Sequence, residues 1–240
     1  MKHQESRILL KEMAPLIREI MIRSGIPPEL AEEIKNITPG LETELSEILS
    51  SDISFISAVY QVFENAREQD FQKQKIVCSE GCSVCCHQTF MLSKLEFEYI
   101  FRGYSDLDTR VRYSAKKRIN KYLSLYKPKA KKIASSLAVS SIPLSRSQNM
   151  ELWHALLSSM WGHACPFLDN DSCIIYEYRP LECRTCFSVD ETKCKKESGG
   201  KLLVTPFDFW ASDTLQGAQV RNGYVQMWPL PHWLMNCDFL

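Results

Sequence analysis

Nine of the ten cysteines in this 240-residue chain fall into two groups, separated by a long stretch without cysteine. The first group is Cys78, Cys82, Cys85 and Cys86, and the second is Cys165, Cys173, Cys183 and Cys186, with Cys194 close behind. Thiolates three or four residues apart can converge on one ion or cluster, and separated groups can complete the same site. The spacing therefore favours metal binding over buried or disulfide-paired cysteines.

The local geometry of the first group decides how many ligands it supplies. If residues 81–87 are helical, Cys82, Cys85 and Cys86 lie near one face, and Cys78 could complete a four-ligand site. If they are extended, Cys85 and Cys86 point to opposite sides, and the second group must complete the site. The sequence leaves both arrangements open.

In the second group, Pro180 suits the first turn of a helix, so Cys183 and Cys186 would follow on adjacent turns. The exposed amides of a helix start stabilise a thiolate over a thiol. Arg179 and Arg184 add positive charge there, or form surface ion pairs with nearby glutamates. Both thiols are expected to project together.

Three motifs resemble the YkgJ-type cysteine-cluster family of zinc- or iron-chelating proteins. They are Cys82-x2-Cys85-Cys86, Cys165-Pro166-Phe167-Leu168, and Cys173-Ile174-Ile175-Tyr176-x2-Arg179-Pro180-x2-Cys183-Arg184. The resemblance covers roughly residues 78–186, and Ser83 stands where that family often has glycine. It implies metal binding and a distant relationship to flagellin lysine N-methylases.

The expected metal ligands are Cys82, Cys85, Cys86, Cys165, Cys173 and Cys183, followed by Cys78 and Cys186. Tyr176, Arg179 and Arg184 are expected around the cofactor, where they orient the chain and offset thiolate charge. Cys194 is a weaker candidate, and Cys237 is expected to pack near the tail. His87 and His163 are expected either at the surface or in contact with the ligating cysteines rather than with the metal.

An iron–sulfur cluster of the 4Fe-4S type is the favoured cofactor, because eight or nine clustered cysteines can hold at least one four-iron cluster with thiolates from both groups. It would serve electron transfer or a partner enzyme. The alternative is structural zinc, held by four thiolates that join separate helical segments.

An enzyme is a third hypothesis, because Cys78-x3-Cys82-x2-Cys85 has the spacing of radical S-adenosylmethionine proteins. The strand and helix alternation of their β/α barrel is not visible, and neither is the glycine-rich turn of a conventional methyltransferase. The chain is therefore expected not to be an enzyme by itself; if it is one, it would be an S-adenosylmethionine-dependent methylase. Thiol–disulfide catalysis ranks lowest, since the βαβ pattern is missing.

The fold class expected from periodicity is mostly α, with an N-terminal helical bundle over residues 1–75 and a loop-rich, metal-centred helical domain over 76–240. Apolar residues from Ile8 to Ile20 predict a first helix, and Pro27-Pro28 begins a second. Thr38-Pro39-Gly40 should interrupt that helix, and residues 41–74 should form one long helix or two that meet near Ser50-Ser51.

Helices should also position the cysteines in the second domain. Ser93 and Glu96 form a capping-box pattern at the start of one helix. Residues 109–132 carry ten Lys or Arg and no acid, with Pro128 expected to end or kink that helix. Residues 150–161 predict another helix, and the proline- and aromatic-rich segment from Leu202 predicts short helix and irregular chain over the site.

Charge and targeting signals limit the partners. The formal net charge is zero, so the chain as a whole has no electrostatic field that favours nucleic acid. The basic helix is expected to be a solvated surface, and the alternative is that it contacts an acidic partner or RNA. A protein partner is expected, and the oligomeric state is open. Neither a secretory signal pattern nor an apolar run of membrane-spanning length is seen, so a reducing cytoplasmic location is expected.

Overall fold

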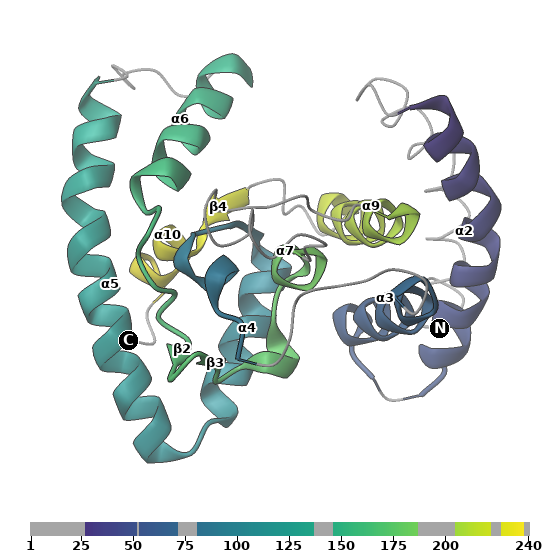
Figure 1. Cartoon of the computed structure of the whole chain (residues 1–240), viewed down its shortest axis with the longest axis horizontal. Helices are drawn as coiled ribbons and strands as arrows, with labels where there is room; N and C mark the ends of the chain where they lie inside the picture. The colour runs from purple at the N-terminus through teal and green to yellow at the C-terminus, as the bar shows by residue number, and fades with distance from the viewer. Residues whose placement is uncertain are drawn as a thin grey trace. The chain divides into compact units, whose positions relative to one another are not determined.

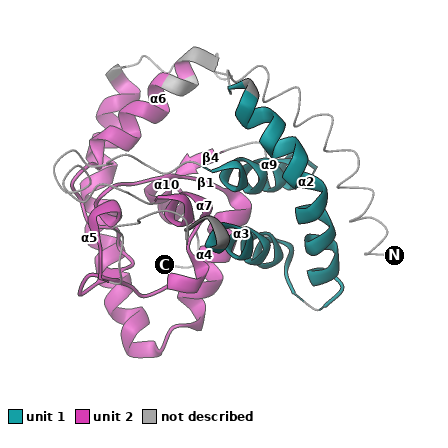
Figure 2. Cartoon of the chain, turned by 45° about the vertical axis from the view of Figure 1, so that its right-hand side comes forward, with its two compact units in different colours: residues 1–77, 187–190, 201–224 teal, residues 78–186, 191–200, 225–240 magenta. Residues whose placement is uncertain are grey.

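The computed structural model describes residues 27–51, 53–71, 81–136, 146–186, 205–221 and 227–237. Helices dominate these residues, so the protein is mostly α-helical, as predicted (Figure 1). The chain divides into two compact units, drawn in teal and magenta in Figure 2. Unit 1 comprises residues 1–77, 187–190 and 201–224, and unit 2 comprises residues 78–186, 191–200 and 225–240.

Unit 1 is built on α2 (Pro28–Ile48), α3 (Phe55–Phe71) and α9 (Pro206–Arg221), each of which packs against the other two. The break between α2 and α3 lies at Ser50-Ser51, where the sequence predicted a meeting of two helices. The first predicted helix, residues 8–20, lies outside the described residues.

The predicted interruption at Thr38-Pro39-Gly40 is wrong, because α2 runs through it. Pro39 cannot donate a backbone hydrogen bond, which costs the helix stability. The Thr38 hydroxyl donates to the Ile34 carbonyl at 2.7 Å, and Leu41 and Leu45 are buried on the far side of the proline. Packing of a continuous apolar face therefore outweighs the local signal.

The prediction of short, irregular structure after Leu202 is also wrong for residues 206–221. They form α9, a helix of 16 residues that belongs to unit 1. Trp210, Ala211, Leu215 and Ala218 are buried along it at helical spacing. The division proposed between residues 75 and 76 remains a proposal.

The described part of unit 2 holds two small antiparallel sheets and five α-helices. β1 (Met91–Ser93) pairs with β4 (Met227–Pro229), and β2 (Leu168–Asp169) pairs with β3 (Ser172–Cys173). The helices are α4 (Lys94–Asp106), α5 (Thr109–Ser136), α6 (Arg146–Ser159), α7 (Leu181–Thr185) and α10 (Leu230–Met235), with the short 3-10 turns η1 (Val84–His87) and η2 (Tyr176–Tyr178).

One apolar core joins α4, α5 and α10 to the cysteine-containing segments. Phe97, Ile100, Ile119 and Leu230 come from α4, α5 and α10, and Phe167 and Ile175 come from the loops next to Cys165 and Cys173. These loops are therefore fixed by apolar packing.

The capping box at α4 is confirmed. The Glu96 backbone N–H donates to Ser93 Oγ at 3.1 Å, and the Ser93 backbone N–H donates back to the Glu96 carboxylate at 3.2 Å. Pro128 was expected to end or kink the basic helix; it does not end it, because α5 continues to Ser136. Ala130 and Ile133, which lie beyond the proline, still pack against the cluster shared with α6.

The predicted helix at residues 150–161 is confirmed as α6, which begins four residues earlier and ends two earlier. Among the described residues, no helix combines the length and apolarity needed to cross a membrane.

Candidate metal centre

The first cysteine group approaches the site through a tight turn. Gly81 has a φ of +83°, a conformation that glycine adopts without strain. Cys82 is exposed after it, and Cys85 and Cys86 lie on η1. The helical arrangement considered for residues 81–87 therefore holds only from Val84 to His87.

Two backbone hydrogen bonds join the first group to the second. The Gly162 N–H donates to the His87 carbonyl at 2.8 Å, and the Cys165 N–H donates to the Cys86 carbonyl at 2.7 Å. Residues that are about eighty positions apart in the sequence are thus neighbours in unit 2.

The hairpin β2–β3 carries Cys173. Its two-residue turn is Asn170-Asp171, with φ of 48° and 59°, as a tight hairpin turn requires. The Ser83 hydroxyl donates to the Asp171 carboxylate at 2.6 Å and so ties the hairpin to the residue before η1. This contact gives a role to the serine that departs from the family pattern.

α7 positions the last two cysteines of the site. Pro180 is its N-cap, one position earlier than expected; Cys183 lies within the helix, and Cys186 is its C-cap. The Leu181 N–H donates to the buried Glu96 carboxylate at 3.1 Å. Glu96 therefore caps two helix starts, and sequence reasoning found only the local one, because the second contact joins residues far apart in sequence.

The three residues expected around the cofactor form one small assembly. The Arg179 guanidinium stacks on the exposed Tyr176 ring, with 3.5 Å between its central carbon and the ring centroid. Arg184 is buried and donates to the carbonyls of Arg179 and Glu177. Arg184 thereby holds α7 to η2. Burial raises the pKa of the Cys173 thiol, and the positive charges of Arg179 and Arg184 partly oppose this rise.

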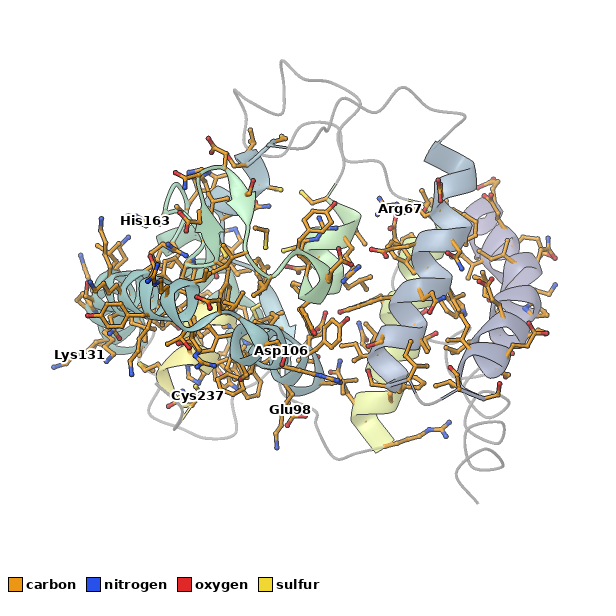
Figure 3. The ribbon with its side chains drawn as sticks, turned by 90° about the horizontal axis from the view of Figure 1, so that it is seen from below. Arg67, Glu98, Asp106, Lys131, His163 and Cys237 are labelled. Atoms are coloured by element: carbon orange, nitrogen blue, oxygen red, sulfur yellow. The ribbon has the colours of Figure 1, made fainter. Side chains whose placement is uncertain are left out.

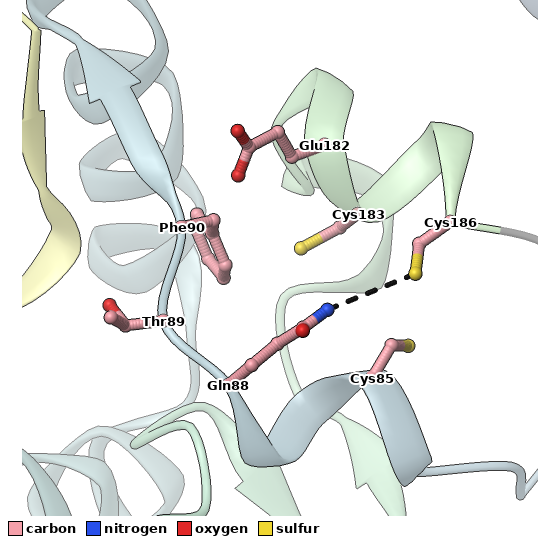
Figure 4. Close-up of a pocket in the computed structure, with 7 residues that line it drawn as sticks. All are labelled: Cys85, Gln88, Thr89, Phe90, Glu182, Cys183 and Cys186. Carbon is pink, nitrogen blue, oxygen red and sulfur yellow. Dashed lines mark hydrogen bonds between the residues drawn. The ribbon is translucent and has the colours of Figure 1, made fainter. Parts of the chain in front are cut away.

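A cavity of about 110 Å³ lies among these elements, large enough for more than a single water or ion. It is lined by Cys85, Gln88, Thr89, Phe90, Glu182, Cys183 and Cys186 (Figure 4). Gln88 lies between the sulfur atoms and donates a long hydrogen bond to Cys186 Sγ at 3.9 Å. Sequence reasoning missed Gln88, for which the only signal is its closeness to Cys86.

The thiols influence one another electrostatically. Burial raises the pKa of Cys165 to about 12 and that of Cys183 well above its usual value, and negative charge on the neighbouring cysteines raises both further. Hydrogen bonds from the Cys186 and Cys86 thiols lower the pKa of Cys85. The hydrogen bond between Cys86 and Cys85 also raises the pKa of Cys86, which donates it. Several thiolates at once would need a nearby cation, and soft thiolates suit zinc or iron–sulfur clusters.

The structure brings together six cysteines, which are Cys85, Cys86, Cys165, Cys173, Cys183 and Cys186. Within the described ranges, no three Cys, His, Asp or Glu side chains already stand in an arrangement that could hold a metal ion. Cys78 and Cys194 lie outside those ranges.

The remaining candidates have other contacts. His87 Nδ1 lies 3.0 Å from the Ser83 carbonyl oxygen, and His163 Nε2 lies 2.7 Å from Lys129 Nζ. Cys237 packs against the core of unit 2, near the chain end.

Comparison with known families gives one match. The model of the CxxCxxCC family, described as "putative zinc- or iron-chelating domain", matches residues 77–200, slightly more than half of the chain. No curated protein and no solved structure shows significant similarity.

Proposed function

Because the chain belongs to the CxxCxxCC family of zinc- or iron-chelating domains, we propose that its cysteines hold an iron–sulfur cluster of the 4Fe-4S type. The proposed ligands are drawn from Cys78, Cys82, Cys85, Cys86, Cys165, Cys173, Cys183 and Cys186. The proposed role is electron transfer, alone or for a partner enzyme, in a reducing cytoplasm.

One observation carries the proposal: thiols from η1 and α7 line one cavity, and Cys165 and Cys173 lie close enough for their charges to act on Cys183 there. Six thiols are enough to supply the four ligands of one such cluster. Burial raises the pKa of Cys165 and of Cys183, so these two thiols would lose their protons only when a cation binds.

Other residues of the chain would support the ligands. The Gln88 amide can donate to a sulfur of Cys186, and hydrogen bonds to ligand sulfurs tune the potential of such centres. Arg179 and Arg184 offset part of the thiolate charge. When bound, a 4Fe-4S cluster supplies one-electron transfer.

Structural zinc is the alternative function. Four thiolates from separate segments would fasten α7 and the β2–β3 hairpin to η1, and such a closed site has no catalytic role. The methylase hypothesis gains no support, because the sheets in the described residues are two antiparallel pairs rather than a β/α barrel.

Anaerobic purification of the full chain, followed by iron, sulfide and zinc analysis and an absorption spectrum, tests the proposal. Iron with acid-labile sulfide and a broad visible absorption band supports it. Colourless protein with one zinc per chain supports the alternative, and cleavage of S-adenosylmethionine after reduction would revive the methylase hypothesis. Protein that takes up neither metal, even after reconstitution, contradicts both metal proposals.

A further inference from the structure

Helix α5 presents a line of unused positive charge. Five of its six exposed cations form what we call the basic stripe: Arg110, Lys117, Lys121, Lys131 and Lys132. With 3.6 residues per turn they fall within an arc of about 100° and extend over about 33 Å of helix. Buried Ala115, Ile119 and Tyr126 lie on the opposite face.

Three other cations of α5 are already engaged. Arg118 forms an ion pair with Asp169 at 3.1 Å, Arg112 donates to the Ser105 carbonyl, and Lys129 donates to the Ser159 carbonyl. In the part of the chain that the structure describes, no member of the basic stripe forms an ion pair. Lys131 extends away from the ribbon in Figure 3.

The same helix holds the segment that follows Cys165. Arg118 Nε donates to the Pro166 carbonyl at 3.0 Å, and the Arg118 ion pair fixes β2. A helix is about 10 Å across with its side chains, so a partner on the basic stripe would lie roughly one helix diameter from this segment. A surface there is well placed to bring a second protein near the cysteines.

We propose that the basic stripe is a docking surface for a protein that presents a row of carboxylates. This proposal does not depend on which metal the cysteines bind. Four of the five cations are lysines, whose flexible stems and point charges steer and hold an acidic surface without a fixed geometry. The contact is therefore transient and sensitive to salt, like other small charged interfaces.

Nucleic acid and membrane fit the surface less well. The exposed aromatic residue on this arc is Tyr113, and the Lys117 ammonium lies 4.4 Å from its ring centroid, so this face is not open for a stacked base. A helix that lies on a membrane needs an apolar face to insert, and the apolar face of α5 is buried in the core.

Fluorescence anisotropy with the full chain tests the proposal against three probes: a labelled glutamate-rich helical peptide, a poly-uridine oligonucleotide, and vesicles containing phosphatidylserine. The charge-reversal variant is Lys117→Glu/Lys121→Glu/Lys131→Glu. The matched control is Lys35→Glu/Arg102→Glu/Arg221→Glu, which changes the net charge equally at exposed positions outside α5. Circular dichroism and a thermal melt verify that both variants fold.

The peptide should bind wild type most tightly of the three probes, and the stripe variant should lose about tenfold in affinity, whereas the control should lose less than about twofold. Raising the salt from about 50 to about 200 mM should weaken the wild-type complex severalfold. Tighter binding of oligonucleotide or vesicles than of peptide would overturn the proposal. Equal losses in the two variants, or no binding of the peptide to wild type, would overturn it as well.

Discussion

Cys183 is the residue whose substitution reports most directly on the metal centre. Its thiol lines the cavity, and burial, followed by the charges of Cys165, Cys85 and Cys173, raises its pKa. Replacing it by serine removes a soft ligand, so Cys183→Ser should lose about 90% of the bound metal under dilute conditions. Metal analysis of purified protein gives the measurement.

Cys237→Ser is the matched control for that variant, because Cys237 packs against the core and is not among the proposed ligands. It should retain wild-type metal content. Full metal content in Cys183→Ser would remove Cys183 from the proposed ligand set.

Asp213 of α9 allows a test of pH dependence in unit 1. Burial raises its pKa to about 6, and its Oδ2 atom is buried without a hydrogen bond within the described residues. An unfolded aspartate has a pKa of about 3.9. Below about pH 4 the carboxyl is protonated in both states and costs no stability, and as the pH rises to about 6 the free energy of unfolding falls, because ionisation is less favourable in the folded state.

Asp213→Asn removes that titration. The variant should exceed wild type in free energy of unfolding by about 1–2 kcal/mol at pH 8, and the two should differ little near pH 4. Urea unfolding at both pH values measures the difference. If the variant and wild type differed in free energy of unfolding by the same amount at both pH values, ionisation of the Asp213 carboxyl would not be the cause of the difference.

Among the elements, α4 and η2 depend on a glycine. A Cβ at Gly103 would lie less than 3 Å from the Cβ and ring atoms of Tyr178, which cannot move without moving η2. Gly103→Ala should therefore lower the free energy of unfolding by about 1–3 kcal/mol, as overpacking commonly does.

Gly40 of α2 is the contrasting position, because a Cβ there has no neighbour within 4 Å. Gly40→Ala should raise stability by up to about 1 kcal/mol, through the better helix propensity of alanine. Chemical denaturation compares the two variants. Equal effects of the two substitutions would mean that the contact with Tyr178 does not limit position 103.

Elements governed by local chemistry were predictable from sequence, and those governed by distant packing were not. The Ser93–Glu96 capping box depends on residues three apart, and it is confirmed. Pro39 and Pro128 are local breaking signals, but apolar side chains that pack on both sides of each proline keep the helix continuous. The cysteine spacing predicted that the thiols come together. The contacts of Glu96 with α7 and of Gln88 with Cys186 join residues far apart in the sequence, so no local spacing pattern could predict them.

At the scale of the whole molecule, a neutral chain carries strongly separated charge. Lys and Arg together equal Asp and Glu in number, yet residues 109–132 contain ten cations and no acid. Net charge therefore says little about this protein's partners, and the local field of α5 decides which surfaces it attracts.

Metal binding should stabilise the two units unequally. The proposed ligands all belong to unit 2, and they would join η1 to segments about eighty or more residues away in sequence. A metal bound only by the folded arrangement contributes its binding free energy to that fold. Local opening of the segments it joins then becomes rarer, and backbone amides there exchange more slowly.

Hydrogen exchange measured on metal-loaded and chelator-treated full-length protein tests this difference. Protection should rise in residues 84–93 and 165–186, whereas α2 and α3 of unit 1, which carry no proposed ligand, should exchange at nearly unchanged rates. The Cys237→Ser variant should give the same pattern as wild type. A uniform rise across both units would show that the metal stabilises the whole chain as one cooperative structure, and no rise at residues 165–186 would place the ligands elsewhere.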